Sequence, residues 1–131
     1  MNEIDVVLSL DMLLVEQEQI FTKCHDILEA KNKDYSLSGD AFYNLKAVER
    51  NNIIPTEIGL LARMNDKFAR ICNLIKNCGL AMVKDETLED TMLDMINYLV
   101  LTLAYLKVKR ARREEASAKE EPKEGFTALV A

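Results

Sequence analysis

The chain has 131 residues, a formal net charge of −5 and a hydrophobic content of 49%. This length predicts a single domain, and the hydrophobic content is enough for a packed core. The negative charge argues against binding of duplex nucleic acid, because such proteins need a basic surface to neutralise phosphates. It does not exclude a small nucleotide, since a bound cation can bridge acidic side chains and phosphate groups.

The cysteine content and the apolar runs predict a cytoplasmic protein without a membrane span. The chain has an odd number of cysteines, 3, and no Cys-x-x-Cys motif, so neither a disulfide framework nor a zinc site is expected. No basic region precedes the first apolar run, so a signal peptide is not expected either. The most apolar run, "MINYLVLTLAYL", has about 12 residues, whereas a bilayer-spanning helix needs roughly 20.

The hydrophobic pattern predicts an all-α fold, a helical bundle of about four main helices. The chain has only 2 prolines, and apolar residues recur at helical rather than alternating spacing. We expect helices over residues 4–30, about 40–54, 56–77 and 85–110, with a loop over 31–40. Thr56 and Asp85 are the expected N-caps of the last two helices. The first half of the first helix is apolar almost all round and should be buried. Another subunit is one candidate for covering it.

The end of the chain has a different composition from the rest. From residue 107 onward the sequence "KVKRARREEASAKEEPKEG" is charged and of low complexity. Such a segment is typical of a fraying helix end that passes into a solvated tail. We therefore predict one all-α domain over residues 1–110 and a charged, flexible tail over 111–131.

The helix expected over residues 56–77 is amphipathic. Its apolar arc contains Ile58, Leu61, Met64, Phe68, Ile71, Cys72 and Ile75. Its polar arc contains Arg63, Asp66, Arg70, Asn73 and Asn77, with Lys67 at the edge. One carboxylate thus stands among cations and amides.

The helix expected over residues 85–110 has a polar arc of the opposite sign. Glu86, Asp90 and Asp94 follow one another at i, i+4 and i+8, and Asn97 continues the arc. Like charges at this spacing disfavour an isolated helix by about 0.2–0.5 kcal/mol per pair, so cations should meet this row. A row of oxygen ligands suits a hard ion, Mg²⁺ or Mn²⁺.

A metal is not the only cation that would satisfy the acidic row. The row can instead face water or form ion pairs with Arg63, Lys67 and Arg70. Beyond Asn97 the same helix is apolar around most of its circumference, which predicts burial on several sides. This favours a cavity lined by the carboxylates, because buried charges must be paired or bound to a metal.

The stretch "KNKDYSLSGDAFYNL", residues 31–45, is polar but holds three aromatic residues. It is either a linker between helices or one wall of a site. In a site Tyr35 can stack on a base, Lys33 can reach a phosphate and Asn44 can hydrogen-bond a base or sugar. We expect Phe42 only to anchor the stretch to the core.

Three segments in this order, "KNKDYSLSGDAFYNL", "RMNDKFARICNL" and "VKDETLEDTMLDMINYLV", resemble a known family. They are similar to the phage and bacterial nucleotide modification associated domain type 1 proteins. That group is similar to the all-α nucleoside triphosphate pyrophosphatases, the MazG-like superfamily. The resemblance covers about residues 20–106. It implies an oligomeric helical bundle, a dimer or tetramer, in the cytoplasm, or in the host cytoplasm if a phage encodes it.

The resemblance also implies a reaction and a set of site residues. Enzymes of the superfamily cleave between the α- and β-phosphates with Mg²⁺ and release pyrophosphate. Carried over to this sequence, the metal ligands are Asp66, Glu86, Asp90 and Asp94, and Glu86 or Asp90 orients the attacking water. The nucleotide-binding residues are Lys33, Asp34, Tyr35, Asn44, Lys67 and Arg70.

The sequence departs from the superfamily in its acidic residues. The earlier helix has Arg63-x-x-Asp66 where the pattern has Glu-x-x-Glu, and the later acids are spaced by four rather than three. Fewer acids hold fewer Mg²⁺ ions and weaken activation of water. Two alternatives to an enzyme therefore stay open. One is a non-catalytic protein that sequesters or escorts a nucleotide, and the other is a structural bundle whose polar arcs form salt bridges.

Overall fold

The structure is a computed structural model that describes residues 5–35, 39–78 and 86–120, apart from the side chains of residues 33–35, 78 and 86. These residues form α-helices and no strands. The helices are α1 (Leu10–Tyr35), α2 (Ala47–Arg50), α3 (Thr56–Cys78) and α4 (Glu86–Lys119). The predicted all-α class is therefore confirmed.

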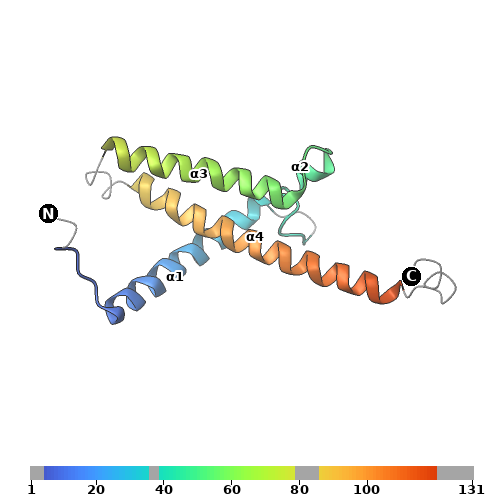
Figure 1. Ribbon diagram of the computed structural model, residues 1–131, viewed down its shortest axis with the longest axis horizontal. Helices are drawn as coiled ribbons and strands as arrows, with labels where there is room; N and C mark the ends of the chain where they lie inside the picture. Colours follow the sequence, from blue (N-terminus) through green and yellow to red (C-terminus); the bar gives the residue numbers. More distant parts are fainter. Residues whose placement is uncertain (1–4, 36–38, 79–85, 121–131) are drawn as a thin grey trace, which may run out of the picture.

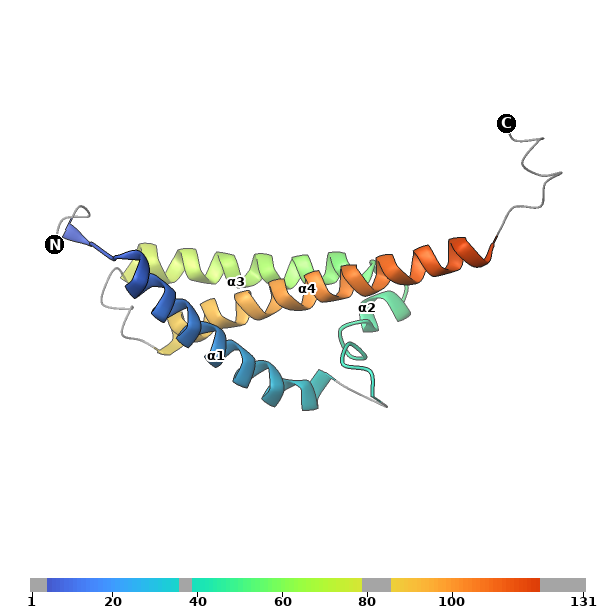
Figure 2. The ribbon, with the colours of Figure 1, turned by 90° about the horizontal axis from the view of Figure 1, so that it is seen from below.

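The centre of the molecule is the antiparallel pair of α3 and α4 (Figure 1). α1 packs across the N-terminal half of α4, and the short α2 packs on the beginning of α3. The last turns of α4 run past the start of α3 and leave the rest of the molecule, as both views show (Figure 2). The first half of α4 therefore packs against both α1 and α3, while residues of its second half contact the turn before α2 and the start of α3.

The helix bounds differ from the expected ones at two places in α1. The helix begins at Leu10 because Ser9 caps it, accepting a hydrogen bond from the N–H of Met12 at 3.2 Å. It continues to Tyr35, so the loop predicted to start at residue 31 is wrong in its first half. Asp85, a predicted cap, lies outside the described residues.

α4 is also longer than expected, since it continues to Lys119. Its charged end is rich in Arg, Lys, Glu and Ala, which are all good helix formers, and Arg110 pairs with Glu114 at 3.1 Å. The domain boundary predicted at residue 110 therefore falls inside a helix. By length and composition alone, Thr87–Lys119 is also sufficient to cross a membrane, a test that core helices of soluble proteins pass too.

The core lies where the turn before α2 meets α3 and α4. Leu45, Leu60 and Leu101 form its buried cluster. Leu28, Phe42, Tyr98 and Tyr105 pack around it, with the rings of Phe42 and Tyr105 5.6 Å apart. The prediction that Phe42 anchors its stretch to the core is confirmed.

The start of α3 is held against α2. The Pro55 carbonyl accepts the N–H of Gly59 at 3.1 Å, so Thr56 is the first helical residue. Its buried hydroxyl donates to Glu49 at 2.9 Å, and the predicted N-cap role of Thr56 is therefore wrong. A Cβ on Gly59 would come within 2.8 Å of Val48, which explains why a glycine stands at this contact.

The apolar first half of α1 is not buried within the chain. Leu10, Met12, Leu13, Leu14 and Val15 are between 47% and 68% exposed. The cause is the crossing of the helices, because α1 reaches α4 only from about Ile20 onward. The single chain does not bury this segment, and its burial against another subunit stays a prediction.

Candidate functional site

Side chains from α1, α3 and α4 meet at Asp94 on α4. Lys31, near the end of α1, donates to Asp94 Oδ1 at 2.7 Å. Lys67, in the middle of α3, donates to Oδ2 at 3.2 Å. The Asp94 side chain is only 19% exposed, so this is a largely buried carboxylate held between two ammonium groups.

The charge balance at Asp94 favours the ionised carboxylate. Burial by itself raises the pKa of Asp94, since a charged group loses hydration there. The hydrogen bonds and positive charges of Lys31 and Lys67 outweigh that effect and place the pKa below its ordinary value. The sequence prediction that cations meet the acidic row holds at this residue.

Asn97, one turn further along α4, fixes α1 in place beside Asp94. Its buried amide donates to the carbonyl of Cys24 at 3.0 Å. A cavity of about 10 Å³ lies next to it, lined by Leu28, Lys31, Asp94, Asn97, Tyr98 and Leu101. This volume suits roughly one water molecule and is far too small for a nucleotide.

Two of the other three predicted metal ligands have described side chains. Asp66 and Asp90 are exposed, and the side chain of Glu86 lies outside the described residues. Asp90 borders a shallow groove of about 420 Å³ between α1 and α4, together with Lys23, Asp26, Ile27, Glu89 and Leu93. Carboxylate oxygens suit Mg²⁺ chemically. An ion at Asp94 would nevertheless have to replace a lysine ammonium.

Among the side chains that the structure describes, one group of three potential ligands has its atoms within 4.8 Å of one another. It consists of His25, Asp26 and Glu29 on the exposed face of α1. Asp66, Asp90 and Asp94 form no such group within the same part of the chain. The magnesium site therefore stays a prediction.

The predicted nucleotide-binding residues lie on α1, on α3 and in the turn before α2. Lys67 is half-buried and forms an ion pair with Asp94. Arg70 lies exposed one turn further along α3. Asn44 is exposed in the turn beside the buried Leu45. Lys33, Asp34 and Tyr35 belong to the last turn of α1, two to four residues after Lys31, but their side chains lie outside the description.

Sequence reasoning missed Lys31, the residue closest to Asp94. The signal was present, because Cys24, Ile27, Leu28 and Lys31 continue one helical face at steps of three and four. Ending the first helix at residue 30 placed Lys31 in a loop. The sequence pattern likewise did not identify Lys23, which pairs with Glu89 at 2.9 Å where α1 crosses α4.

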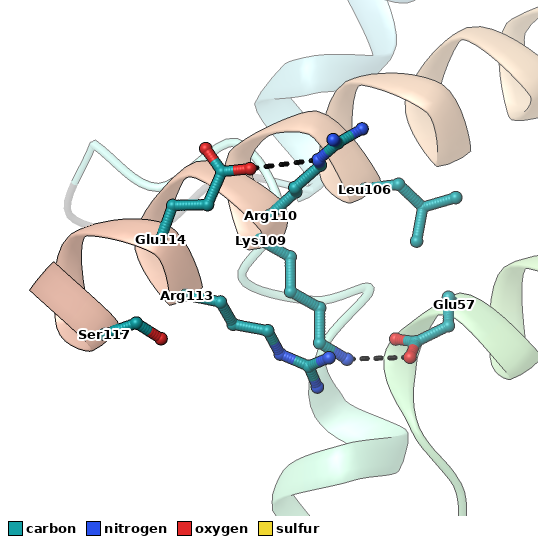
Figure 3. A pocket seen from close by; sticks show the side chains of 7 residues that line it. All are labelled: Glu57, Leu106, Lys109, Arg110, Arg113, Glu114 and Ser117. Atoms are coloured by element: carbon teal, nitrogen blue, oxygen red, sulfur yellow. Dashed lines mark hydrogen bonds and ion pairs between the residues drawn. The ribbon is translucent and has the colours of Figure 1, made fainter.

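A second concave feature lies at the far end of the α3–α4 pair (Figure 3). This basic groove has a volume of about 560 Å³ and is lined by Glu57, Leu106, Lys109, Arg110, Arg113, Glu114 and Ser117. Lys109 donates to Glu57 at 2.7 Å, which is the main cause of the lowered pKa of Glu57. In Figure 3 the Arg113 guanidinium points toward this ion pair.

Comparisons of the chain with protein-family profiles, curated proteins and solved structures find no match. The resemblance to the MazG-like superfamily therefore stays a prediction that rests on the three sequence segments.

Proposed function

We propose that the chain is a Mg²⁺-dependent nucleotide-binding protein with nucleoside triphosphate pyrophosphatase-like activity. The observation that carries the proposal is the contact of Lys31 and Lys67 with Asp94. It joins, at one carboxylate, one residue from each of the three segments that resemble the MazG-like superfamily. A charged cluster drawn from three helices is costly for folding, because each ion loses hydration. Such clusters are common where a ligand uses them.

The chemical roles follow from the side chains near Asp94. Lys67 and Arg70 on α3 would neutralise phosphate oxygens, with Lys31 added to the predicted set. Mg²⁺ would be held by the acids Asp66, Glu86, Asp90 and Asp94. When bound, the ion would neutralise the negative charge of the phosphate groups. Asp90 or Glu86 would orient the attacking water as a general base. The last turn of α1 would contribute Lys33, Asp34 and Tyr35 beside the nucleotide, with Asn44 from the following turn.

A specific observation favours the alternative of a non-catalytic nucleotide binder. Asp94 is already neutralised by two lysines, and Arg63 stands where the superfamily pattern has an acid. Arg63 adds a positive charge where an acid would bind metal, and the two lysines already neutralise Asp94. The site would therefore attract phosphate more strongly than it attracts a metal ion. Such a protein would hold a nucleotide, or a modified one, without cleaving it.

A melting-temperature screen tests both functions. Common and modified nucleoside triphosphates are added with and without Mg²⁺ or Mn²⁺, and each nucleotide that raises Tm is incubated for pyrophosphate analysis. The enzyme predicts a Mg²⁺-dependent Tm shift and pyrophosphate release that Asp90→Asn and Asp94→Asn abolish. Asp11→Asn, an exposed acid at the start of α1, is the matched control and should retain both.

The outcomes separate the alternatives. A Tm shift without pyrophosphate from any nucleotide leaves the binder and removes the enzyme. If no nucleotide changes Tm under either metal condition, both functions fail. The Lys31–Asp94–Lys67 cluster is then a structural ion-pair layer.

A further inference from the structure

The α3–α4 pair exposes a row of large apolar side chains on each helix. On α3 these are Ile58, Leu61, Phe68 and Ile75, and on α4 they are Met92, Leu99, Leu103 and Leu106. Their exposed fractions lie between 38% and 57%. A single soluble chain seldom exposes a contiguous apolar surface of this extent, so such a surface marks an interface.

Both rows lie on the same side of the pair. On α3 the exposed row stands about 80° around the helix from the buried Leu60, Met64 and Ile71, and α4 is the main neighbour of α3. On α4 it stands about 90° in the same sense from Lys109, which donates to Glu57 of α3. Since the helices are antiparallel, similar rotations in the same sense bring both rows to one side. We call this the apolar side.

The opposite side of the pair is the one that α1 covers, and we call it the polar side. There Asn97 reaches the Cys24 carbonyl of α1, and Asp94 reaches Lys31. α1 therefore cannot cover the apolar side, which stays open among the residues that the structure describes.

We propose that the apolar side pairs with the same side of a second copy of this chain, with the two α4 helices antiparallel and crossing near Leu99. The two helices of each copy would then complete a four-helix bundle. A two-fold axis makes such an interface self-complementary, because the same surface serves both copies. The inference does not depend on nucleotide binding.

The distribution of charge along α4 selects a second copy and fixes its direction. Steps of seven residues connect Glu89, Ile96, Leu103 and Arg110 on one line. A second line connects Met92, Leu99, Leu106 and Arg113. The combined row is acidic at its start, uncharged in its middle and basic at its end. Heptad spacing of this kind is typical of helix pairs in bundles.

Only the antiparallel arrangement matches this row with itself. A crossing near Leu99 places Met92 opposite Leu106, and Ile96 opposite Leu103, of the second copy. It also places Glu89 opposite Arg110. A parallel arrangement would set Glu89 beside Glu89 and Arg110 beside Arg110, and like charges that face each other oppose association.

The basic groove lies at the end of the apolar side where the start of the second α4 would arrive. Leu106, Arg110 and Arg113 form part of its lining. The pairs that Glu89 and Arg110 make within the chain are both more than half exposed, so they are weak and can exchange partners. The free end of α4 would gain in the second copy the neighbour that its own chain does not provide.

Cysteine cross-linking tests the direction and register. In the full chain with Cys24, Cys72 and Cys78 replaced by alanine or serine, Leu99→Cys should cross-link two copies under mild oxidation. Met92→Cys combined with Leu106→Cys should cross-link as well, whereas Met92→Cys alone should not. Circular dichroism checks that each variant keeps its helix content. Cross-linking of the single variant Met92→Cys as well as Leu99→Cys would indicate a parallel pair and overturn the proposal. Failure of Leu99→Cys to cross-link would overturn it too.

Sedimentation equilibrium without nucleotide tests the surface. Leu103→Asp should raise the dissociation constant of the dimer by about 100-fold or more. Val108→Asp is the control, because Val108 is 55% exposed against 57% for Leu103 but lies off the apolar side. Glu89→Arg and Arg110→Glu should each weaken the dimer about tenfold, and together restore it.

The remaining outcomes are equally decisive. A chain that is monomeric at high concentration overturns the proposal. If the monomer also floats with phosphatidylcholine or anionic vesicles, the apolar side contacts lipid, as the length and composition of α4 would permit. If Val108→Asp dissociates the dimer as much as Leu103→Asp, the copies meet through a different surface.

Discussion

The polar and apolar sides of the α3–α4 pair differ in how far the chain itself provides contacts for their side chains. On the polar side Lys31 and Lys67 neutralise Asp94, and Asn97 binds a backbone carbonyl of α1. On the apolar side leucine, isoleucine, methionine and phenylalanine side chains remain about half exposed. Buried charges need specific partners at hydrogen-bonding distance, whereas apolar area needs only to leave water. The chain provides the specific partners itself, and in the proposed dimer a second copy would cover the apolar area.

The largest expected effect distinguishes the buried interior of the pair from its apolar side. Leu60 is 1% exposed and its neighbour Leu61 is 51% exposed. Leu60→Ala should lower the free energy of unfolding by about 2–5 kcal/mol, since it removes core contacts and leaves a cavity. Leu61→Ala should cost the isolated chain about 0.5 kcal/mol or less.

Urea denaturation at several protein concentrations measures both variants. With a dimer, the effect of Leu61→Ala grows with concentration, while that of Leu60→Ala is large throughout. Equal effects of both substitutions in the dilute monomer would show that Leu61 is buried within the chain and that the apolar side is not open.

A smaller effect tests the polar side. Asp94→Asn removes the charge that holds Lys31 and Lys67 together, and it should lower the free energy of unfolding by about 1–3 kcal/mol. Asp90→Asn, one turn earlier on an exposed position, should change it by about 0.5 kcal/mol or less. Thermal denaturation of both variants in nucleotide-free buffer gives the comparison. A loss of stability as large for Asp90→Asn would indicate a second essential ion pair.

The smallest effect is the pH dependence of the same contact. The pKa of Asp94 is lowered in the folded chain, so its contribution to stability is present above the unfolded value of about 3.9 and is lost as pH falls through the folded pKa. The stability difference between the parent chain and Asp94→Asn should be constant near neutral pH and shrink below about pH 4. Urea unfolding across this range measures it. A difference that disappears already near pH 6 would require a group other than Asp94.

The site could be predicted from the sequence only in part. The acidic row and the cationic arc followed from helical spacing, and the structure brings their members Lys67 and Asp94 together. The choice of Lys31 as the second partner required the end of α1 to be known within a turn. A sequence pattern locates such an end poorly, because local propensity changes little there.

Burial was the property that the sequence predicted least well. Beyond Asn97 the apolar circumference of α4 predicted burial on several sides, yet Leu99, Val100 and Leu103 are about half exposed. The apolar first half of α1 is likewise exposed in the single chain. The hydrophobicity of a side chain determines that its burial lowers the free energy. It does not specify whether the same chain or another molecule covers the side chain.

The sequence by itself determined the all-α class, the bounds of α3 to within a residue and the two charged arcs, because these depend on spacing within one helix. Only the tertiary structure decided how each apolar arc divides. On α3 Met64 and Ile71 are buried, while Leu61 and Phe68, from the same predicted arc, remain open. The division depends on the angle at which α3 and α4 meet and on the side that α1 takes. Both are set by contacts between residues far apart in the sequence.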